Sequence, residues 1–293
     1  MTNKEPHRIY LGIILVVTAF LFGAIRSAFS KILLQEGISA QVILLFQTII
    51  ALLILLPWIL KNGTKSLAIG NLKQFAVRCV SGFTAIICFI ISLKYTTLAK
   101  AVLLNNASPL FLPILSVFFF RKKLKIRLLF ILAIGFTGII MILKPETGNM
   151  NRGDLLAFLS GALAAVSIVF VRLIQKGKNQ NTQSIIFYYL IFIIICSGLL
   201  SVKHWVIPHN RILWMFILIM GATYSLFQIS FTTAFVHAPA SKISPFIYFG
   251  VIFAGLIDWA VWKNAPDILS ALGMITVIIS AIFSVIFTEK NPP

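Results

Sequence analysis

Long apolar runs recur along nearly the whole chain. A helix needs about 20 consecutive, mostly apolar residues to cross the hydrocarbon core of a bilayer, and ten such runs are present. They cover residues 9–30, 41–60, 75–94, 97–119, 126–143, 154–173, 183–202, 212–236, 239–262 and 266–287. Only 11% of the 293 residues are charged and 59% are hydrophobic, which is too little charge to cover a soluble globule of this size. The sequence therefore predicts an all-α membrane protein with ten transmembrane helices.

Cysteine and histidine give no sign of a reactive or metal-binding site. The three cysteines lie inside apolar runs, and the four histidines are scattered without metal-ligand spacing. The sequence thus predicts no disulfide framework, no metal, no cofactor and no catalytic residue. We expect no cleavable signal peptide, because the first apolar run is too long and lacks a small-residue cleavage site at its end.

The net charge of +18 lies mainly in short loops between the apolar runs. A nucleic-acid-binding protein displays its positive charge on a folded surface, whereas loop lysines and arginines are typical of the cytoplasmic side of a membrane protein. These residues concentrate at the N-terminus and in 61–78, 121–127 and 172–178. We therefore expect both termini to be cytoplasmic and no nucleic-acid partner.

The most polar linker, KPETGNMNRGD at 144–154, falls near the centre of the chain. It divides the ten spans into five and five, so we expect one repeat at 1–147 and a second at 148–293. Because each half holds an odd number of spans, homologous halves have opposite orientations in the membrane, as in many secondary transporters. A weak internal echo agrees with this: Ser108-Pro109 in the fourth span resembles Ser244-Pro245 in the ninth.

The fourth span carries two amides and a proline near its middle, where a membrane span is normally an uninterrupted apolar helix. Asn105 and Asn106 lie about 13 Å into the span at 1.5 Å per residue, near the middle of the bilayer. Pro109 has no N–H to donate to the carbonyl of Asn105, which interrupts the helix. Transporters place binding sites in such interrupted helices, but asparagine also joins neighbouring helices. Both interpretations remain open for this pair.

The eighth span contains the clearest polar stripe. It consists of Gly221, Tyr224, Ser225, Gln228 and Thr232, which share one helix face. The small residues allow close packing against another helix. Tyrosine and glutamine suit close packing poorly and can hydrogen-bond a polar solute, so the stripe favours the lining of a cavity.

Charged residues within the spans are few. Arg26 lies in the outer half of the first span, and because Lys31 occupies the outer end, we expect Arg26 to face a wet cavity. Asp258 approaches the outer end of the ninth span, and its expected role is an ion pair with nearby Lys263 rather than proton coupling. Further expected lining residues are Gln47, Tyr188 and Tyr248. Arg78, at the start of the third span, is typical of an anchor at the cytoplasmic surface.

Three stretches carry a resemblance to a known family. They are FGAIRSAFSK (22–31), RCVSGFTAIICFIISLKYTTLAKAVLLNNASPLF (78–111) and NRGDLLAFLSGALAAVSIVFVR (151–172). In their order and spacing they resemble the ten-helix EamA-like permeases of the drug/metabolite transporter superfamily, along essentially the whole chain. The resemblance implies a carrier that works by alternating access, and it adds Arg78 to the expected binding residues. The chain departs from the family where a glutamate often follows the fourth and ninth helices, since Lys122 and Asn264 stand there.

The expected cargo follows from the charges inside the spans. No acid lies near the middle of any span, and arginine with amide donors favours a carboxylate or phosphate. We therefore expect a small anionic or zwitterionic metabolite, such as an amino acid or, from the family resemblance, a nucleotide-like compound such as S-adenosylmethionine. The alternative within the family is a drug or multidrug efflux permease.

Two other classes of protein fit the sequence less well. A membrane enzyme needs a nucleophile with a base or a metal cluster, and a channel needs a repeated polar filter; the sequence shows neither pattern. The expected partners are a small-molecule substrate and membrane lipid, and the expected location is a bacterial inner membrane. Whether the protein is a monomer or a homodimer stays open.

Overall fold

The structure is a computed structural model that describes residues 4–61, 71–120, 126–143, 151–175, 182–206, 208, 210–237 and 244–289. These residues form helices joined by turns, with no strand among them. The first half holds α1 (Lys4–Gln35), α2 (Ala40–Lys61), α3 (Leu72–Ser92), α4 (Leu98–Asn105), α5 (Ser108–Phe120) and α6 (Ile126–Leu143). The second holds α7 (Arg152–Gln175), α8 (Thr182–Ser201), η3 (Val202–His204), α9 (Arg211–His237), η4 (Ser244–Tyr248), α11 (Phe249–Trp262) and α12 (Ile268–Glu289). Lys122 and the expected boundary between residues 147 and 148 lie outside the described residues.

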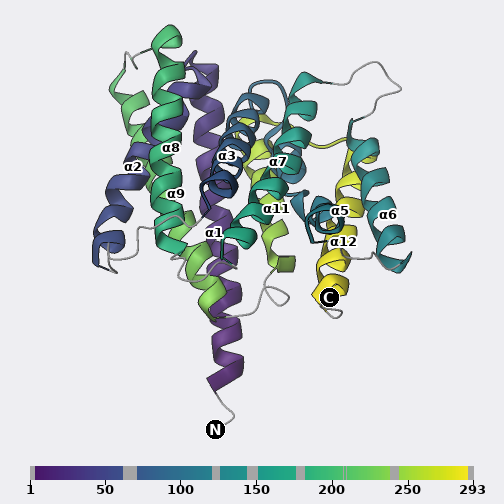
Figure 1. The fold of residues 1–293 in the computed structure, drawn as a ribbon. Helices are drawn as coiled ribbons and strands as arrows, with labels where there is room; N and C mark the ends of the chain where they lie inside the picture. The colour runs from purple at the N-terminus through teal and green to yellow at the C-terminus, as the bar shows by residue number, and fades with distance from the viewer. Residues whose placement is uncertain are drawn as a thin grey trace.

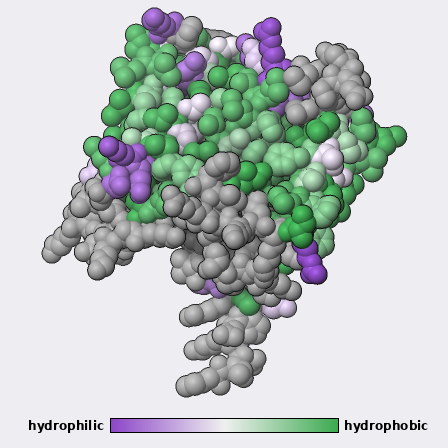
Figure 2. Space-filling view, turned by 45° about the vertical axis from the view of Figure 1, so that its right-hand side comes forward, coloured by the Kyte–Doolittle hydropathy of each residue, from purple (hydrophilic) through white to green (hydrophobic). Residues whose placement is uncertain are grey.

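The helices have the length and composition of membrane spans. Within the described residues, five are long and apolar enough to cross a bilayer, namely Ile9–Gln35, Ala40–Pro57, Leu72–Ser92, Arg152–Val171 and Arg211–Phe231. The other five predicted spans contain shorter apolar helical stretches. Figure 2 shows apolar residues across the middle of one face, with the hydrophilic residues mainly toward its edges. The predicted all-α fold with ten helical spans is confirmed.

The closest helix packing joins the two halves. The most extensive contacts are α1 with α9, α3 with α7 and α6 with α12, and α2 also packs along α8. Since α7 and α9 are the first and third spans of their half, exchanging the halves converts the α1–α9 pair into the α7–α3 pair. The α2–α8 and α6–α12 pairs map onto themselves and lie at opposite edges of the bundle (Figure 1). The chain is therefore built as two repeats that pack around a pseudo-twofold axis.

Two glycines mark where α6 and α12 cross. A Cβ added to Gly138 would lie 2.9 Å from the carbonyl oxygen of Gly273, and a Cβ on Gly273 would lie 2.7 Å from that of Gly138. Small residues of this kind let two helix backbones approach closely in a membrane. The contact is reciprocal, as expected for equivalent positions in two repeats.

The fourth and ninth spans are both irregular at their Ser-Pro dipeptides. α4 ends at Asn105 and α5 begins at Ser108, so the fourth span is broken as predicted. In the ninth span a 3-10 helix, Ser244–Tyr248, precedes α11. A proline removes one backbone donor and disfavours regular helix before it, so equivalent spans of the two repeats share one irregularity.

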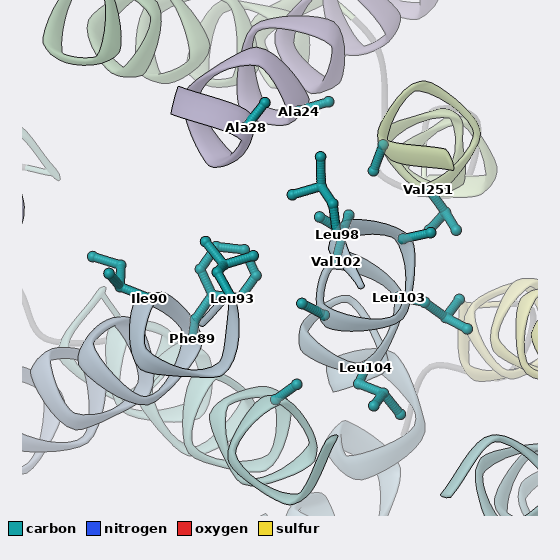
Figure 3. Close-up of a cluster of buried hydrophobic side chains, with 14 of the residues drawn as sticks. Ala24, Ala28, Phe89, Ile90, Leu93, Leu98, Val102, Leu103, Leu104 and Val251 are labelled. Atoms are coloured by element: carbon teal, nitrogen blue, oxygen red, sulfur yellow. The ribbon is translucent and has the colours of Figure 1, made fainter. Parts of the chain in front are cut away.

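The main core runs through the bundle and includes the end where α1 ends and α4 begins, which the sequence predicts to face outward and which we call the outer end. Side chains of α1, α3, α4 and α11 gather there, including Ala28, Phe89, Leu98 and Val251 (Figure 3). They come from both halves, so this apolar packing holds the repeats together at the outer end.

Candidate functional site

Arg26 extends from α1 toward α9. Its guanidinium carbon lies 5.2 Å from the ring centroid of Tyr224 and 5.7 Å from that of Phe89. The Tyr224 hydroxyl accepts a hydrogen bond from Nε2 of Gln228 at 3.2 Å. An arginine over aromatic faces is held without a carboxylate partner, since the rings attract the cation by their quadrupoles. The structure thus brings together Arg26, Tyr224 and Gln228, which the sequence predicts separately as lining residues.

The rest of the polar stripe on α9 has a different role. A Cβ on Gly221 would lie 2.6 Å from Ile50, so this position lets α2 approach closely. The Ser225 hydroxyl donates to the carbonyl of Gly221 at 3.0 Å, within its own helix. The Thr232 side chain lies outside the described residues. The stripe therefore combines both uses that its composition suggests: close packing at Gly221 and a polar contact at Tyr224 and Gln228.

Arg78 lies in the interior between α3, α7 and α8. Its Nη1 donates to the hydroxyl of Ser167 at 2.5 Å, and its guanidinium carbon lies 3.8 Å from the ring centroid of Tyr189. Gly82, one turn further along α3, leaves room for all three groups: an added Cβ would lie 2.7 Å from the Tyr189 hydroxyl and 2.9 Å from that of Ser167. Arg78 thus reaches into the bundle rather than toward the cytoplasmic surface.

The two arginine sites lie on neighbouring helices. Tyr189 of α8 contacts Arg78, and the next residue of α8, Leu190, packs with Tyr224, which contacts Arg26. We call Arg26, Tyr224, Tyr189 and Arg78 the arginine–tyrosine cluster. Its arginines come from the first half of the chain and its tyrosines from the second, so the cluster lies between the repeats.

Several polar atoms in and beside the cluster have no partner. Among the described residues, Nε of Arg26, Nε of Arg78 and both amide atoms of Gln47 are buried without a hydrogen bond. Gln47 is 0% exposed and lies one turn before Ala51, which packs with Leu190 and Tyr224. A buried polar group without a partner is costly. Three such side chains in helices that pack around one cluster make it the candidate site for a polar ligand.

The amides of the broken fourth span take part in contacts between the halves. Oδ1 of Asn105 accepts a hydrogen bond from Ser160 of α7 at 3.0 Å. The Tyr248 hydroxyl donates to the backbone carbonyl of Asn106 at 3.4 Å. The Asn106 side chain is half-buried. Asn105 therefore joins two helices. At the helix break, the Tyr248 hydroxyl supplies the hydrogen-bond donor for the Asn106 carbonyl.

Tyr188 is not brought into the cluster. It packs edge-on against Phe75, with 6.3 Å between ring centroids, in an apolar group with Cys79 and Ile185. One residue along a helix is a rotation of about 100°, so Tyr188 and Tyr189 face different neighbours.

The expected pairing of Asp258 is wrong. Its Oδ1 lies 3.4 Å from Nζ of Lys31, and its Oδ2 accepts the backbone N–H of Ala99 at 3.0 Å. Lys31 is 5% exposed and does not occupy the outer surface. Lys263 instead ends α11 with a positive φ of 57°. The bundle turns Asp258 inward toward α1 and the first turn of α4, where its charge is matched by the buried Lys31 ammonium and one backbone N–H.

The sequence analysis did not predict the polar contacts of Tyr189, Ser167 and Lys31. Ser160 and Ser167 lie seven residues apart on one face of α7, and each contacts a polar residue of the first half. This spacing was a usable signal. No pattern along α8 distinguishes Tyr189 from Tyr188, because only packing decides which ring meets Arg78.

A ten-helix bundle in which buried atoms of Arg26, Arg78 and Gln47 lack hydrogen bonds is typical of a polytopic membrane protein with a polar interior. The sequence matches the EamA-like transporter family twice, over residues 10–144 and 151–286, once in each half. The chain therefore belongs to the EamA-like transporter family, as the resemblance implied, and it is a transporter of ten helices in two repeats.

Named relatives agree with this class. The chain is 25% identical over 272 residues to the pseudopaline exporter of Pseudomonas aeruginosa, covering 92% of this chain and 94% of that protein. It is 23% identical over 282 residues to the S-adenosylmethionine uptake transporter of Rickettsia prowazekii, covering 96% and 94%. One solved crystal structure shares the fold with a TM-score of 0.63 at 15% identity, covering 96% of this chain and 99% of that one. These bacterial relatives imply a small-molecule substrate.

Proposed function

We propose that the protein is a secondary transporter that moves a small anionic or zwitterionic metabolite by alternating access. One observation carries this proposal: the buried, unpartnered atoms of Arg26, Arg78 and Gln47 at an interface between the two repeats. A solute that supplies acceptors there compensates groups that the protein leaves without partners. The arginines favour a carboxylate or phosphate on that solute.

The contacts at the outer end suggest how access alternates. Lys31 of α1 pairs with Asp258 of α11, and Nε1 of Trp262 donates to Oε1 of Gln35 at 3.0 Å. Both contacts join the two halves at one end of the bundle. For a solute to pass this end, these contacts must separate, so rocking of one repeat against the other is the motion we propose.

The relatives support a cargo of metabolite size. Their names specify pseudopaline in one case and S-adenosylmethionine in another. We infer an amino acid or a nucleotide-like compound as the cargo class of this chain. We also infer a location in a bacterial inner membrane with both termini in the cytoplasm, and a division of the repeats between residues 147 and 148. Reporter fusions at both termini test the orientation.

Ligand-dependent stabilisation and transport by the purified protein test the proposal. We expect an anionic or zwitterionic metabolite to raise the melting temperature and to be exchanged saturably in proteoliposomes. Gln228→Ala removes the donor to Tyr224 and should reduce exchange about tenfold or more, the effect of losing one or two buried hydrogen bonds.

The control for this experiment is Tyr188→Phe, which changes a tyrosine outside the cluster and should leave exchange unchanged. Asn106→Ala provides a second test beside the helix break, since it should lower exchange without loss of folded protein. Stabilisation by hydrophobic cations alone would favour the drug-efflux alternative. A linear conductance without saturation would contradict a carrier.

A further inference from the structure

We propose that the transported solute carries two acidic groups and binds as a dianion, with one acidic group at each arginine of the arginine–tyrosine cluster. This inference rests on the proposed function and specifies its substrate class. It starts from the charge balance of the site. Arginine stays protonated at any physiological pH, so Arg26 and Arg78 bring two fixed positive charges into the bundle.

The two acids inside the apolar stretches of the described helices, Asp154 and Asp258, are engaged elsewhere. The chain has only seven acidic residues. Asp258 is held by Lys31 and by the N–H of Ala99. Asp154, in the first turn of α7, accepts a hydrogen bond from Thr96. The contacts of Arg26 and Arg78 within the described residues are instead with aromatic rings and a serine hydroxyl. Within the described helices, the protein therefore leaves both positive charges uncompensated.

The two arginines contact α3 at two different levels of the bundle. The Arg26 guanidinium lies beside Phe89, and that of Arg78 lies beside Gly82, seven residues earlier on α3. Seven residues of helix correspond to on the order of 10 Å at 1.5 Å per residue. A single carboxylate reaches only about 3 Å in a charge-assisted hydrogen bond. A solute with an acidic group at each end offers one such group to the arginine at each level.

The outer end of the bundle carries positive charge, which also suits an anionic solute. A polar cavity of about 380 Å³ is lined there by Lys31, Lys94 and Lys100 together with Asp154. Lys31 and Asp154 already have partners, so Lys94 and Lys100 give the cavity an excess of positive charge. A cleft with an excess of one sign of charge concentrates ions of the opposite sign. This field favours a net anion over a zwitterion or a cation.

A dianion compensates the two arginines better than a neutral amino acid or S-adenosylmethionine, the solutes that the family resemblance also allows. A neutral amino acid supplies one carboxylate and places its ammonium in a site that already carries two positive charges. S-adenosylmethionine has one carboxylate, an ammonium and a sulfonium, so its net charge is positive. Both leave at least one arginine uncompensated in a medium of low dielectric constant, where like charges repel strongly.

The test compares linear dicarboxylates from succinate to pimelate with monocarboxylates of equal length, neutral amino acids and S-adenosylmethionine. Purified protein is assayed for its melting temperature, and proteoliposomes are assayed for exchange. We expect at least one dicarboxylate to raise the melting temperature by several degrees and to be exchanged, with little effect of the matched monocarboxylate. Arg26→Gln and Arg78→Gln should each weaken binding about tenfold or more, the effect of losing a hydrogen bond to a charged group. The control variant Arg127→Gln, which changes an exposed arginine of α6, should leave binding unchanged.

The outcomes separate this inference from the proposed function. Exchange of a neutral amino acid or S-adenosylmethionine, with no response to any dicarboxylate, would overturn the dianion and leave the transporter intact. Absence of exchange for every solute would overturn the proposed function itself.

A second measurement needs no ligand. An arginine kept for a solute destabilises the empty protein, and replacing a buried uncompensated charge by an apolar side chain of similar length is often stabilising. Arg26→Met should therefore raise the melting temperature of the ligand-free protein by a few degrees, while Arg127→Met leaves it unchanged. A lower melting temperature for Arg26→Met would show that this arginine stabilises the fold and would overturn its assignment to the solute.

Discussion

At the scale of single residues, the position of Arg78 depends on the absence of a side chain at Gly82. The space above Gly82 holds the Arg78 guanidinium, the Tyr189 hydroxyl and the Ser167 hydroxyl. These groups come from three helices, α3, α8 and α7. A glycine inside a helix is normally unfavourable by about 1 kcal/mol relative to alanine. Here it makes the polar contact between the two halves sterically feasible.

Gly82→Ala should reduce transport without unfolding the protein. The added methyl group meets the ends of the Arg78, Tyr189 and Ser167 side chains, which can move away, and alanine favours the helix. We therefore expect exchange in proteoliposomes to fall about tenfold or more, since a charged hydrogen bond is lost, while the melting temperature changes little.

Gly198→Ala in α8 is the matched control, because its nearest neighbour would be Leu45 at 3.9 Å. This variant should transport normally. Equal transport by both variants would show that Arg78 does not act where the structure places it.

At the scale of the elements, α7 closes around the break between α4 and α5. Ser160 hydrogen-bonds Asn105, and the next residue, Gly161, lies directly against the carbonyls that end α4. A Cβ at Gly161 would lie 3.2 Å from the Asn105 carbonyl oxygen and closer still to that of Leu104. The break is therefore held by the first helix of the other repeat.

Gly161→Ala should destabilise the bundle. Its methyl group meets backbone atoms, which cannot rotate away, so α4 and α7 must separate. Overpacking of this kind costs about 1–3 kcal/mol and outweighs the gain in helix propensity. The measurement is the melting temperature in detergent, which should fall.

Gly255→Ala serves as the control for this prediction, since its nearest neighbour would be Ala99 at 3.9 Å. It should keep or raise the melting temperature, because alanine is the better helix former. A fall for Gly255→Ala with none for Gly161→Ala would contradict the packing of α7 against the break.

At the scale of the whole molecule, a buried ion pair joins the two halves at the outer end. Lys31 and Asp258 have side-chain exposures of 7% and 1%. The Lys31 ammonium also lies 4.6 Å from the ring centroid of Trp262. Removing one partner of a buried pair leaves the other charge without compensation.

Asp258→Asn should therefore lower the stability by roughly 3–5 kcal/mol, the usual cost of breaking a buried pair. The asparagine oxygen can still accept the N–H of Ala99, so the loss reports mainly on Lys31. The double variant Lys31→Met/Asp258→Asn should recover much of the melting temperature, because no charge then stays unpaired.

Lys263→Gln tests the pairing that the sequence alone suggested for Asp258. It should leave the melting temperature unchanged, because Lys263 lies outside the buried pair. A loss for Lys263→Gln as large as that for Asp258→Asn would favour the pairing with Lys263.

The sequence by itself determined which segments cross the membrane, because lipid requires each spanning segment to be apolar and to satisfy its own backbone hydrogen bonds. Those requirements act locally, so the ten spans and the irregular fourth span could be predicted, as could several polar residues within them. Two repeats were also foreseeable from the central linker and the odd number of spans in each half.

Only the tertiary structure decided which polar residues meet. Tyr189 rather than Tyr188 contacts Arg78, because one residue turns a helix by about 100° and packing selects the face. Asp258 pairs with Lys31, which is 227 residues away in sequence, rather than with Lys263, because the two halves bring α11 against α1. Such pairings depend on contacts between helices of different halves, and no local property of the sequence specifies them.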